Sequence, residues 1–258
     1  MALVAPSAVV GPEVSIGPWC EVGPDVIIER GARLHAHVVV EGHTRIGAGA
    51  ELFPFCTVGL APQDLKYRGE PTGCEIGERT QVREHCTIHR GTASGRGVTR
   101  IGADCLVMAV AHVAHDCRIG DGVIIANNVV MGGHVEIADQ AVIGGAAALH
   151  QYVRIGRAAI VGGVSGVDAD VVPFGAVLGN RARLTGPNVV GLRRRGFDRD
   201  AVRKLRAVFR SLFRQESVFA QRLDETRRRY GGDSLVREIL SFIDAPSRRG
   251  LIRAALRS

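Results

Sequence analysis

Three features are missing from this chain of 258 residues, and each absence excludes a class of protein. No apolar run reaches 18 uninterrupted residues, so we expect no transmembrane segment. The first residues, MALVAPS, contain neither a basic region nor a long apolar core, which argues against a secretory signal. The six cysteines form no Cys-x-x-Cys pair, so we expect reduced thiols and a cytoplasmic location.

Aromatic residues are also scarce, at 5% of the chain, which argues against a core stacked on large rings. Val, Ile and Ala dominate the apolar residues, and β-branched side chains favour strands. Charge is uneven, because 18 Lys and Arg stand against 8 Asp and Glu from residue 191 onwards, whereas the rest of the chain is slightly acidic. Such a basic tail can attract nucleic acid, an anionic membrane or an acidic protein.

What the chain does contain is an aliphatic residue at every sixth position, often followed by glycine. This period fits neither a helix nor a simple strand, and it predicts one short strand per repeat with a turn after each. Three strands make an 18-residue coil, and successive coils stack about 4.8 Å apart. The series runs Val4, Val10, Ile16, Val22, Ile28, Leu34, Val40, Ile46, Leu52, Val58, Ile76, Val82, Ile88, Ile101, Val107, Val113, Ile119, Ile125, Met131, Ile137, Ile143, Leu149, Ile155, Val161 and Val167.

The repeat predicts a mainly β fold, a left-handed parallel β-helix of hexapeptide repeats over residues 1–186. It breaks at about 59–75 and 89–100, where we expect loops that leave the scaffold, and long loops often carry function. Residues 187–258 predict a C-terminal α-helical domain, because helical spacing replaces the hexads there. We expect Asp198 and Asp233 to cap two helices, a helix over 216–230, and a last short helix over 248–257.

All nine histidines lie in the repeat region, and the 18-residue period places several of them together. His115, Gly133 and Gln151 differ by 18 and fall in one column, and Asp116 and His134 share the next. His150 lies in the column before, so we expect these residues to crowd one edge of the scaffold.

This edge has the parts of an acyl-transfer site. The His115 imidazole can take a proton from an attacking hydroxyl, and Asp116 can orient the ring and stabilise its charged form. A glycine N–H from 132–133 can meet the developing oxyanion. The same histidines can instead hold zinc, which would suggest a carbonic-anhydrase-like lyase.

Several stretches resemble the UDP-N-acetylglucosamine O-acyltransferase family, which opens lipid A biosynthesis, and the resemblance covers nearly the whole chain. They are residues 62–67 (PQDLKY), 69–72 (GEPT), 87–92 (TIHRGT), 112–117 (HVAHDC), 126–128 (ANN), 133–135 (GHV), 150–151 (HQ), 163–167 (GVSGV) and 191–197 (GLRRRGF).

The resemblance implies transfer of a 3-hydroxyacyl chain from acyl carrier protein to the glucosamine 3-hydroxyl of UDP-N-acetylglucosamine. It implies a homotrimer with sites between subunits, no metal, and no cofactor beyond the phosphopantetheine of the carrier protein. It makes His115 the general base and the Gly133 backbone the oxyanion contact. The positions implied around the substrates are Gln63, Asp64, His134 and Gln151 at the sugar, Lys66, His112 and His150 in support, and Asn188, Arg194 and Arg195 at the nucleotide.

Two positions bear on specificity. Val190 stands where the family pattern has an acidic residue, two places after the matching asparagine. Gly163 matches a position that limits acyl length, and its lack of a side chain predicts a preference for a longer chain.

Alternatives from other classes remain open at this point. They are a related acyltransferase acting on a 3-amino sugar nucleotide or using coenzyme A, the metal lyase, and a purely structural or binding β-helix. For the basic tail we expect acidic acyl carrier protein as the partner and no nucleic acid, because the chain has no nucleic-acid motif and few rings for stacking.

Overall fold

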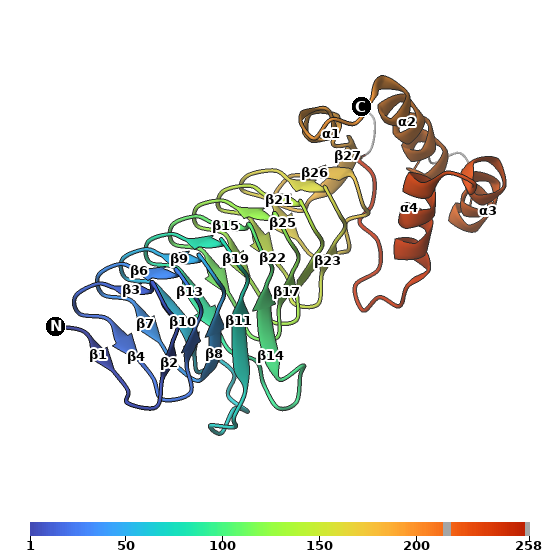
Figure 1. Cartoon of the computed structure of the whole chain (residues 1–258). Helices are drawn as coiled ribbons and strands as arrows, with labels where there is room; N and C mark the ends of the chain where they lie inside the picture. The colour runs from blue at the N-terminus through green and yellow to red at the C-terminus, as the bar shows by residue number, and fades with distance from the viewer. Residues whose placement is uncertain (214–217, 256–258) are drawn as a thin grey trace.

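The structure, a computed structural model, describes residues 1–213 and 218–255 and shows a three-sided β-helix with helices at one end (Figure 1). Each coil gives one strand to each of three sheets, called here A, B and C, and the strands of successive coils pair in parallel. In sheet A, for example, His112 pairs with Thr87 on one side and with Val130 on the other. Residues 18 positions apart, such as His112 and Val130, therefore lie side by side in successive coils, as expected.

The three sheets are built mostly from two-residue strands. Sheet A consists of β1 (Leu3–Val4), β4 (Glu21–Val22), β7 (Val39–Val40), β10 (Thr57–Leu60), β13 (Thr87–His89), β16 (His112–Val113), β19 (Val130–Met131), β22 (Ala148–Leu149) and β25 (Gly166–Val167). Sheet B consists of β2 (Val9–Val10), β5 (Ile27–Ile28), β8 (His43–Ile46), β11 (Gly73–Ile76), β14 (Val98–Ile101), β17 (Arg118–Ile119), β20 (Glu136–Ile137) and β23 (Arg154–Ile155). Sheet C consists of β3 (Ser15–Ile16), β6 (Arg33–Leu34), β9 (Glu51–Leu52), β12 (Gln81–Val82), β15 (Leu106–Val107), β18 (Ile124–Ile125), β21 (Val142–Ile143), β24 (Ile160–Val161), β26 (Gly175–Leu178) and β27 (Arg183–Pro187).

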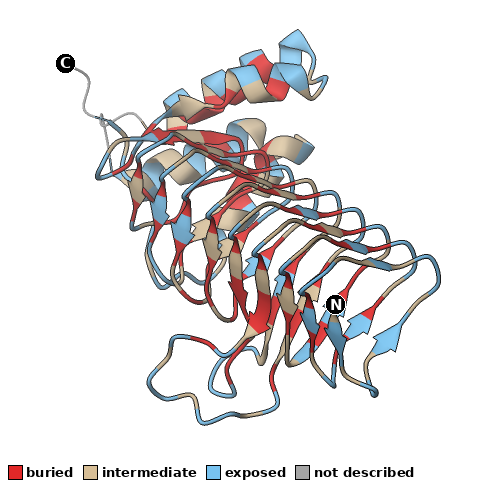
Figure 2. Ribbon diagram, turned by 90° about the vertical axis from the view of Figure 1, so that its left-hand side faces the viewer, coloured by how far each residue is buried: buried red, intermediate tan, exposed pale blue. Residues whose placement is uncertain are grey.

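The core of the prism follows directly from the hexads (Figure 2). The aliphatic residue of each repeat points inward, and Ile28, Ile125 and Ile143 are at most 1% exposed. A second buried residue lies two places before the inward one, and all six cysteines occupy such positions. All six cysteines are buried and unpaired. Burial raises the pKa of Cys74 and of Cys117 to about 12, so these two thiols stay protonated and act as small apolar groups.

Both breaks in the repeat are loops between paired strands, shorter than the ranges 59–75 and 89–100 taken from the sequence. The first loop covers 61–72, because β10 extends to Leu60 and β11 begins at Gly73. The second covers 90–97, since β13 ends at His89 and β14 begins at Val98. Strand pairing captures the flanking residues, which a count of hexads assigns to the break. Both loops leave the edge between sheets A and B.

The helical part begins with α1 (Val189–Arg194), continues with α2 (Arg199–Phe213) and α3 (Phe219–Tyr230), and ends with α4 (Ser234–Asp244). The expected caps are confirmed: the Asp198 carboxylate accepts from Ala201 N at 2.7 Å, and the Asp233 carboxylate accepts from Leu235 N at 3.0 Å. The helix expected over 216–230 begins at Phe219 among the described residues, and 216–217 lie outside them. No helix in the described part of the chain is long and apolar enough to cross a membrane.

The helix expected over 248–257 is wrong for the described residues up to 255. Residues 246–255, called here the return segment, are not helical and pass beside the last coils at the C-terminal end of the prism (Figure 1). Their backbone bridges Leu251 to Asp170 and Ala254 to Leu184. Gly250, with φ of +67°, and Pro246 break helical geometry, and prism backbone replaces the hydrogen bonds that a helix would have made. The helical region expected over 187–258 thus also contains a non-helical segment that packs on the prism.

Candidate active site

The edge between sheets A and B brings together the residues that the coil period aligned. His134 N donates to His115 O at 3.0 Å, and Tyr152 N donates to Gly133 O at 3.1 Å, so three coils stack there in register. Asp116, His134 and Tyr152 occupy equivalent left-handed corner positions, with φ between 60° and 67°. The repeated corner therefore aims these side chains along one line of the prism.

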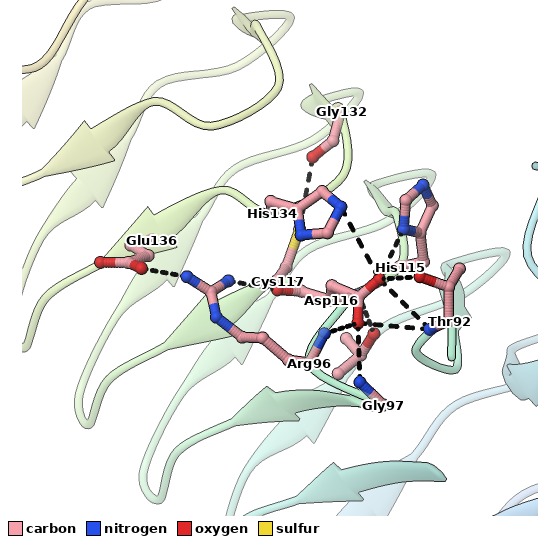
Figure 3. A network of polar contacts seen from close by, with 10 residues as sticks. Thr92, Arg96, Gly97, His115, Asp116, Cys117, Gly132, His134 and Glu136 are labelled. Carbon is pink, nitrogen blue, oxygen red and sulfur yellow. Dashed lines mark hydrogen bonds and ion pairs between the residues drawn. The ribbon is translucent and has the colours of Figure 1, made fainter. Parts of the chain in front are cut away.

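Asp116 is the most enclosed polar residue of this edge (Figure 3). Its carboxylate is fully buried and accepts from Thr92 N, Thr92 Oγ1 at 2.7 Å, Arg96 N at 2.7 Å and Gly97 N at 3.1 Å. These donors all belong to loop 90–97. His115 Nδ1 lies 2.8 Å from Asp116 Oδ2 and completes the set. The second break in the repeat thus forms a cage for one carboxylate.

The cage keeps the carboxylate ionised. Burial alone would raise the pKa of Asp116, but the hydrogen bonds from His115, Thr92 and Arg96 outweigh it and lower the pKa to about 2. Glycine is required at position 95, because a Cβ there would lie 2.4–2.6 Å from the Asp116 carboxyl atoms. An ionised, immobile carboxylate therefore faces His115 Nδ1.

Gly133 lies directly beneath the His115 ring. A Cβ on Gly133 would lie 2.5 Å from His115 Cε1 and 2.7 Å from Nε2, so only glycine fits this close approach. Gly133 is buried, and among residues 1–213 and 218–255 its N–H donates no hydrogen bond. A buried backbone donor without a partner beside a histidine is rare, and it suits an oxygen that becomes negative during a reaction.

Two further histidines flank this pair. His134 meets the His115 ring edge-on at 5.2 Å between centroids and stacks on Tyr152 at 4.4 Å. Burial lowers the pKa of His134, and nearby Asp116 only partly offsets this. His112 Nδ1 lies 2.7 Å from Thr87 Oγ1, and burial and then His115 lower its pKa. Both flanking rings are therefore held neutral and can act as hydrogen-bonding groups.

A metal ion fits this cluster poorly, although ligand atoms of His115, Asp116 and His134 all lie within 4.8 Å of one another. His115 Nδ1 and Asp116 Oδ2 are 2.8 Å apart and are joined by a hydrogen bond. Two ligands of a tetrahedral zinc ion lie roughly 3.3 Å apart, given bonds of about 2.0 Å. Zinc held by these two atoms would require the pair to separate and to lose the hydrogen bond between them.

His150 and Gln151 are exposed on the same edge and contact the return segment. Arg249 Nε donates to Gln151 O at 2.8 Å, and Arg249 Nη2 lies 2.5 Å from His150 Nδ1. The neighbouring Arg248 guanidinium covers the Tyr152 ring at 4.3 Å. Neither arginine is predicted at this edge from the sequence, because a helix is expected in their place.

The first loop, 61–72, carries Gln63, Asp64 and Lys66 away from the prism. Asp64 Oδ1 accepts from Lys66 N at 2.9 Å and shapes a turn, and Arg90 anchors the loop through Tyr67 Oη at 2.8 Å. Among the described residues no hydrogen bond or ion pair joins this loop to His115. The structure of one chain thus does not bring these three residues to the His115 edge.

The residues matched to the nucleotide lie beside a different edge, between sheets B and C. Asn188 is buried, and its amide accepts from Gly191 N and donates to Ala158 O, each at 3.0 Å. Arg195 donates to Gly191 O and, at 2.6 Å, to Gln140 O, and burial lowers its pKa. Asn188 therefore caps α1 in this chain, where the resemblance implied a substrate contact. Arg194 and Val190 are exposed on α1.

Gly163 lies on the third edge, between β24 of sheet C and β25 of sheet A. A Cβ there would approach only Gly145, with its oxygen at 3.3 Å, so the surface above Gly163 is open. The three groups of residues matched to base, nucleotide and acyl chain thus occupy three different edges of one prism.

Comparison with known proteins gives a consistent result. A family model described as UDP N-acetylglucosamine O-acyltransferase, domain 2, matches residues 170–252, and a model of six bacterial transferase hexapeptide repeats matches 7–42 and 99–133. The acyl-[acyl-carrier-protein]–UDP-N-acetylglucosamine O-acyltransferase of Azorhizobium caulinodans is 50% identical over 97% of this chain and 92% of its own length. The protein of the same name from Caulobacter vibrioides is 48% identical over 97% of this chain and 95% of its own length.

Solved structures agree with these relatives. The UDP-N-acetylglucosamine acyltransferase of Campylobacter jejuni superposes with a TM-score of 0.93 at 35% identity, over 98% of both chains. That of Francisella novicida gives 0.94 at 31% identity, over 98% of this chain and 92% of its own. The expected left-handed parallel β-helix with C-terminal helices is confirmed, and this chain belongs to the acyl-[acyl-carrier-protein]–UDP-N-acetylglucosamine O-acyltransferase family.

Proposed function

We propose that this chain transfers a 3-hydroxyacyl group from acyl carrier protein to the glucosamine 3-hydroxyl of UDP-N-acetylglucosamine, the first step of lipid A biosynthesis. The observation that carries this proposal is the 2.8 Å contact between His115 Nδ1 and the caged carboxylate of Asp116, above the free N–H of Gly133. The names of the relatives support the two substrates.

The tautomer of His115 follows from its partner. An ionised carboxylate only accepts hydrogen bonds, so Nδ1 carries the proton and Nε2 keeps its lone pair. Nε2 takes the proton of the sugar hydroxyl as its oxygen attacks the thioester carbon. Asp116 stabilises the imidazolium that forms, without taking its proton.

Collapse of the intermediate completes the transfer. The carbonyl oxygen becomes negative on attack, and the Gly133 N–H donates to it. The carbon–sulfur bond then breaks, and the His115 imidazolium returns its proton to the leaving thiolate. The products are the O-acylated sugar nucleotide and carrier protein with a free thiol. The phosphopantetheine of the carrier protein delivers the acyl group, so the proposed mechanism uses no cofactor or metal bound to this protein.

An acyl-transfer assay tests the proposal directly. Wild-type protein is incubated with 3-hydroxyacyl carrier protein and UDP-N-acetylglucosamine, beside His115→Ala, and esters are measured by mass spectrometry. We expect His115→Ala to lose about two to four decades of rate while the fold is retained. Near-normal turnover by this variant would overturn the mechanism. A 3-amino sugar nucleotide offered in parallel distinguishes amide from ester formation, and faster amide formation would favour that alternative.

We also propose a homotrimer with sites shared between subunits. The groups matched to base, nucleotide and acyl chain lie on three edges of one prism, so a complete site needs more than one copy. The outer face of sheet A supports this, because it is mostly uncharged. Its outward residues include Leu3, Val39, Thr57, Val130 and Ala148, and Glu21 is the acidic residue among them. Sheet B instead carries the outward charged residues Arg45, Glu75, Arg100, Arg118 and Glu136. Light scattering should give three times 27.5 kDa.

The helical domain offers a surface for the acidic carrier protein. Five arginines, called here the arginine groove, line a cavity of about 350 Å³ on α1 and α2: Arg193, Arg199, Arg203, Arg206 and Arg210. We propose that acyl carrier protein docks on this groove. The six buried, unpaired thiols fit a reducing compartment, so we place the reaction in the cytoplasm.

A further inference from the structure

The return segment is held firmly against the prism by its backbone. Asp170 N donates to Gly250 O at 2.8 Å, and Ile252 N donates to Asp170 O at 2.9 Å. Asp170 is itself fully buried, and its carboxylate accepts from Arg154 Nε at 2.7 Å. These contacts fix the segment at the end of the catalytic edge. Gly250, which makes one of them, directly follows Arg249 in the sequence.

Arg249 is the residue of this segment that contacts His150. Its Nη2 lies 2.5 Å from His150 Nδ1, while its Nε donates to Gln151 O at 2.8 Å. A guanidinium has five N–H donors, no acceptor, and a charge at every pH that matters here. His150 Nδ1 must therefore accept, so the ring is neutral and its proton sits on Nε2.

One other contact bears on this tautomer. His150 Nδ1 also lies 3.4 Å from Gln151 O, an arrangement that would favour a proton on Nδ1. That contact is long and at the limit of a hydrogen bond, and Arg249 already donates to the same carbonyl oxygen. The shorter contact, from a donor that cannot accept, decides the tautomer.

The result is opposite to that at His115. There Nδ1 faces a carboxylate, which places the proton on Nδ1 and leaves Nε2 as a base. Two histidines of one edge thus receive opposite tautomers from partners of opposite charge. One offers a lone pair, and the other offers an N–H.

We propose that Arg249 is a positioning residue that fixes His150 as a hydrogen-bond donor, through Nε2–H, to an acceptor oxygen of the bound substrate. His150 then cannot compete with His115 for the hydroxyl proton. This inference rests on the proposed acyl transfer for its kinetic consequence, but the tautomer itself can be measured without substrate.

The first measurement is NMR of protein labelled with ¹⁵N-histidine, with the His150 signals assigned from their loss in His150→Gln. We expect the wild type to show a single Nε2–H tautomer at His150 and Arg249→Met to show a mixture. Arg248→Met is the matched comparison, since it removes a neighbouring guanidinium that covers Tyr152, whereas the hydrogen bonds to His150 and Gln151 come from Arg249. An unchanged tautomer in Arg249→Met would overturn the proposal, whatever substrate the protein uses.

The second measurement separates positioning from mere attachment of the segment. We expect Arg249→Met to lower kcat/KM about tenfold in the wild type but less than about twofold in a His150→Ala background. Arg253→Met, on the same segment, removes the same charge from an exposed side chain, and we expect normal kcat/KM. Equal losses in both backgrounds, or a fall in Tm that accounts for the loss, would mean that Arg249 acts only on the fold. If the wild type transfers no acyl group, the proposed function is wrong. The NMR experiment still tests whether Arg249 fixes the tautomer of His150.

Discussion

The prism edge and the arginine groove hold their charged groups in opposite ways. Asp116 is fully buried and receives hydrogen bonds from three residues of loop 90–97 as well as from His115. In the groove, Arg203 pairs with Asp200 with both side chains about four-fifths exposed, and Arg199 and Arg206 are exposed too. Enclosed charges keep one geometry, which chemistry requires, whereas exposed ones adapt to a partner and respond to salt. Substitutions at the edge should therefore change kcat, and those in the groove should change KM.

The largest effect is expected from Asp116→Asn. The amide keeps the shape of the side chain but loses the charge that holds His115 in its tautomer and stabilises the imidazolium. We expect kcat to fall by about two to four decades with little change in KM. The matched control is Asp121→Asn, a corner carboxylate on another edge that accepts from Ala103 N, and it should keep kcat within about twofold. Equal kcat in the two variants would remove Asp116 from the mechanism.

Gly133→Ala tests the contact between the ring and the backbone beneath it. The new Cβ would lie 2.5–2.7 Å from ring atoms of His115, so the ring must move. A shift of about 1 Å in a catalytic group costs roughly a hundredfold in rate, and we expect kcat to fall by about that much. Gly23→Ala lies on the same edge several coils before His115, where a Cβ finds only ordinary contacts from 3.4 Å, and it should retain full activity. A normal rate for Gly133→Ala would contradict the geometry.

Part of the catalytic edge could be predicted from the sequence, and part could not. Period alone aligned His115 with Gly133 and Asp116 with His134, because each coil repeats the backbone of the last. It could not show that Thr92 and Arg96 enclose Asp116, since an inserted loop has no register of its own. The arginines of the return segment were missed for a related reason: their contacts join residues about 98 positions apart and depend on a backbone that is not helical there.

Asn188 shows what a motif match leaves open. Its nucleotide contact stays a prediction, and the structure adds that its side chain caps α1 and bonds to Ala158 O. Polar residues near helix starts often satisfy backbone groups, and only the structure reveals which demand is met.

Reversing charge in the arginine groove should have a moderate effect on KM alone. With Arg203, Arg206 and Arg210 changed to Glu, we expect KM for acyl carrier protein to rise at least about tenfold, because attraction becomes repulsion. Tm and kcat should change little, since these side chains are largely exposed on α2. Arg228→Glu, on the exposed face of α3 and outside the groove, is the control, and its KM should match the wild type. An unchanged KM in the triple variant would end the assignment of the groove to the carrier protein.

The smallest effect is expected at Gly163, where the prism presents an open surface with neither a cage nor an array of charges. We expect the wild type to prefer acyl chains longer than ten carbons, and Gly163→Met to move the optimum to shorter chains by lowering kcat/KM for long ones about fivefold. The cost to stability should be small, because a Cβ there meets only Gly145 O at 3.3 Å. Carrier-protein thioesters of graded length measure both quantities in one series. A wild-type preference for ten carbons or fewer would refute the role of Gly163. So would an optimum that Gly163→Met leaves unchanged. In either case, the missing side chain at position 163 would not set the length of the acyl chain.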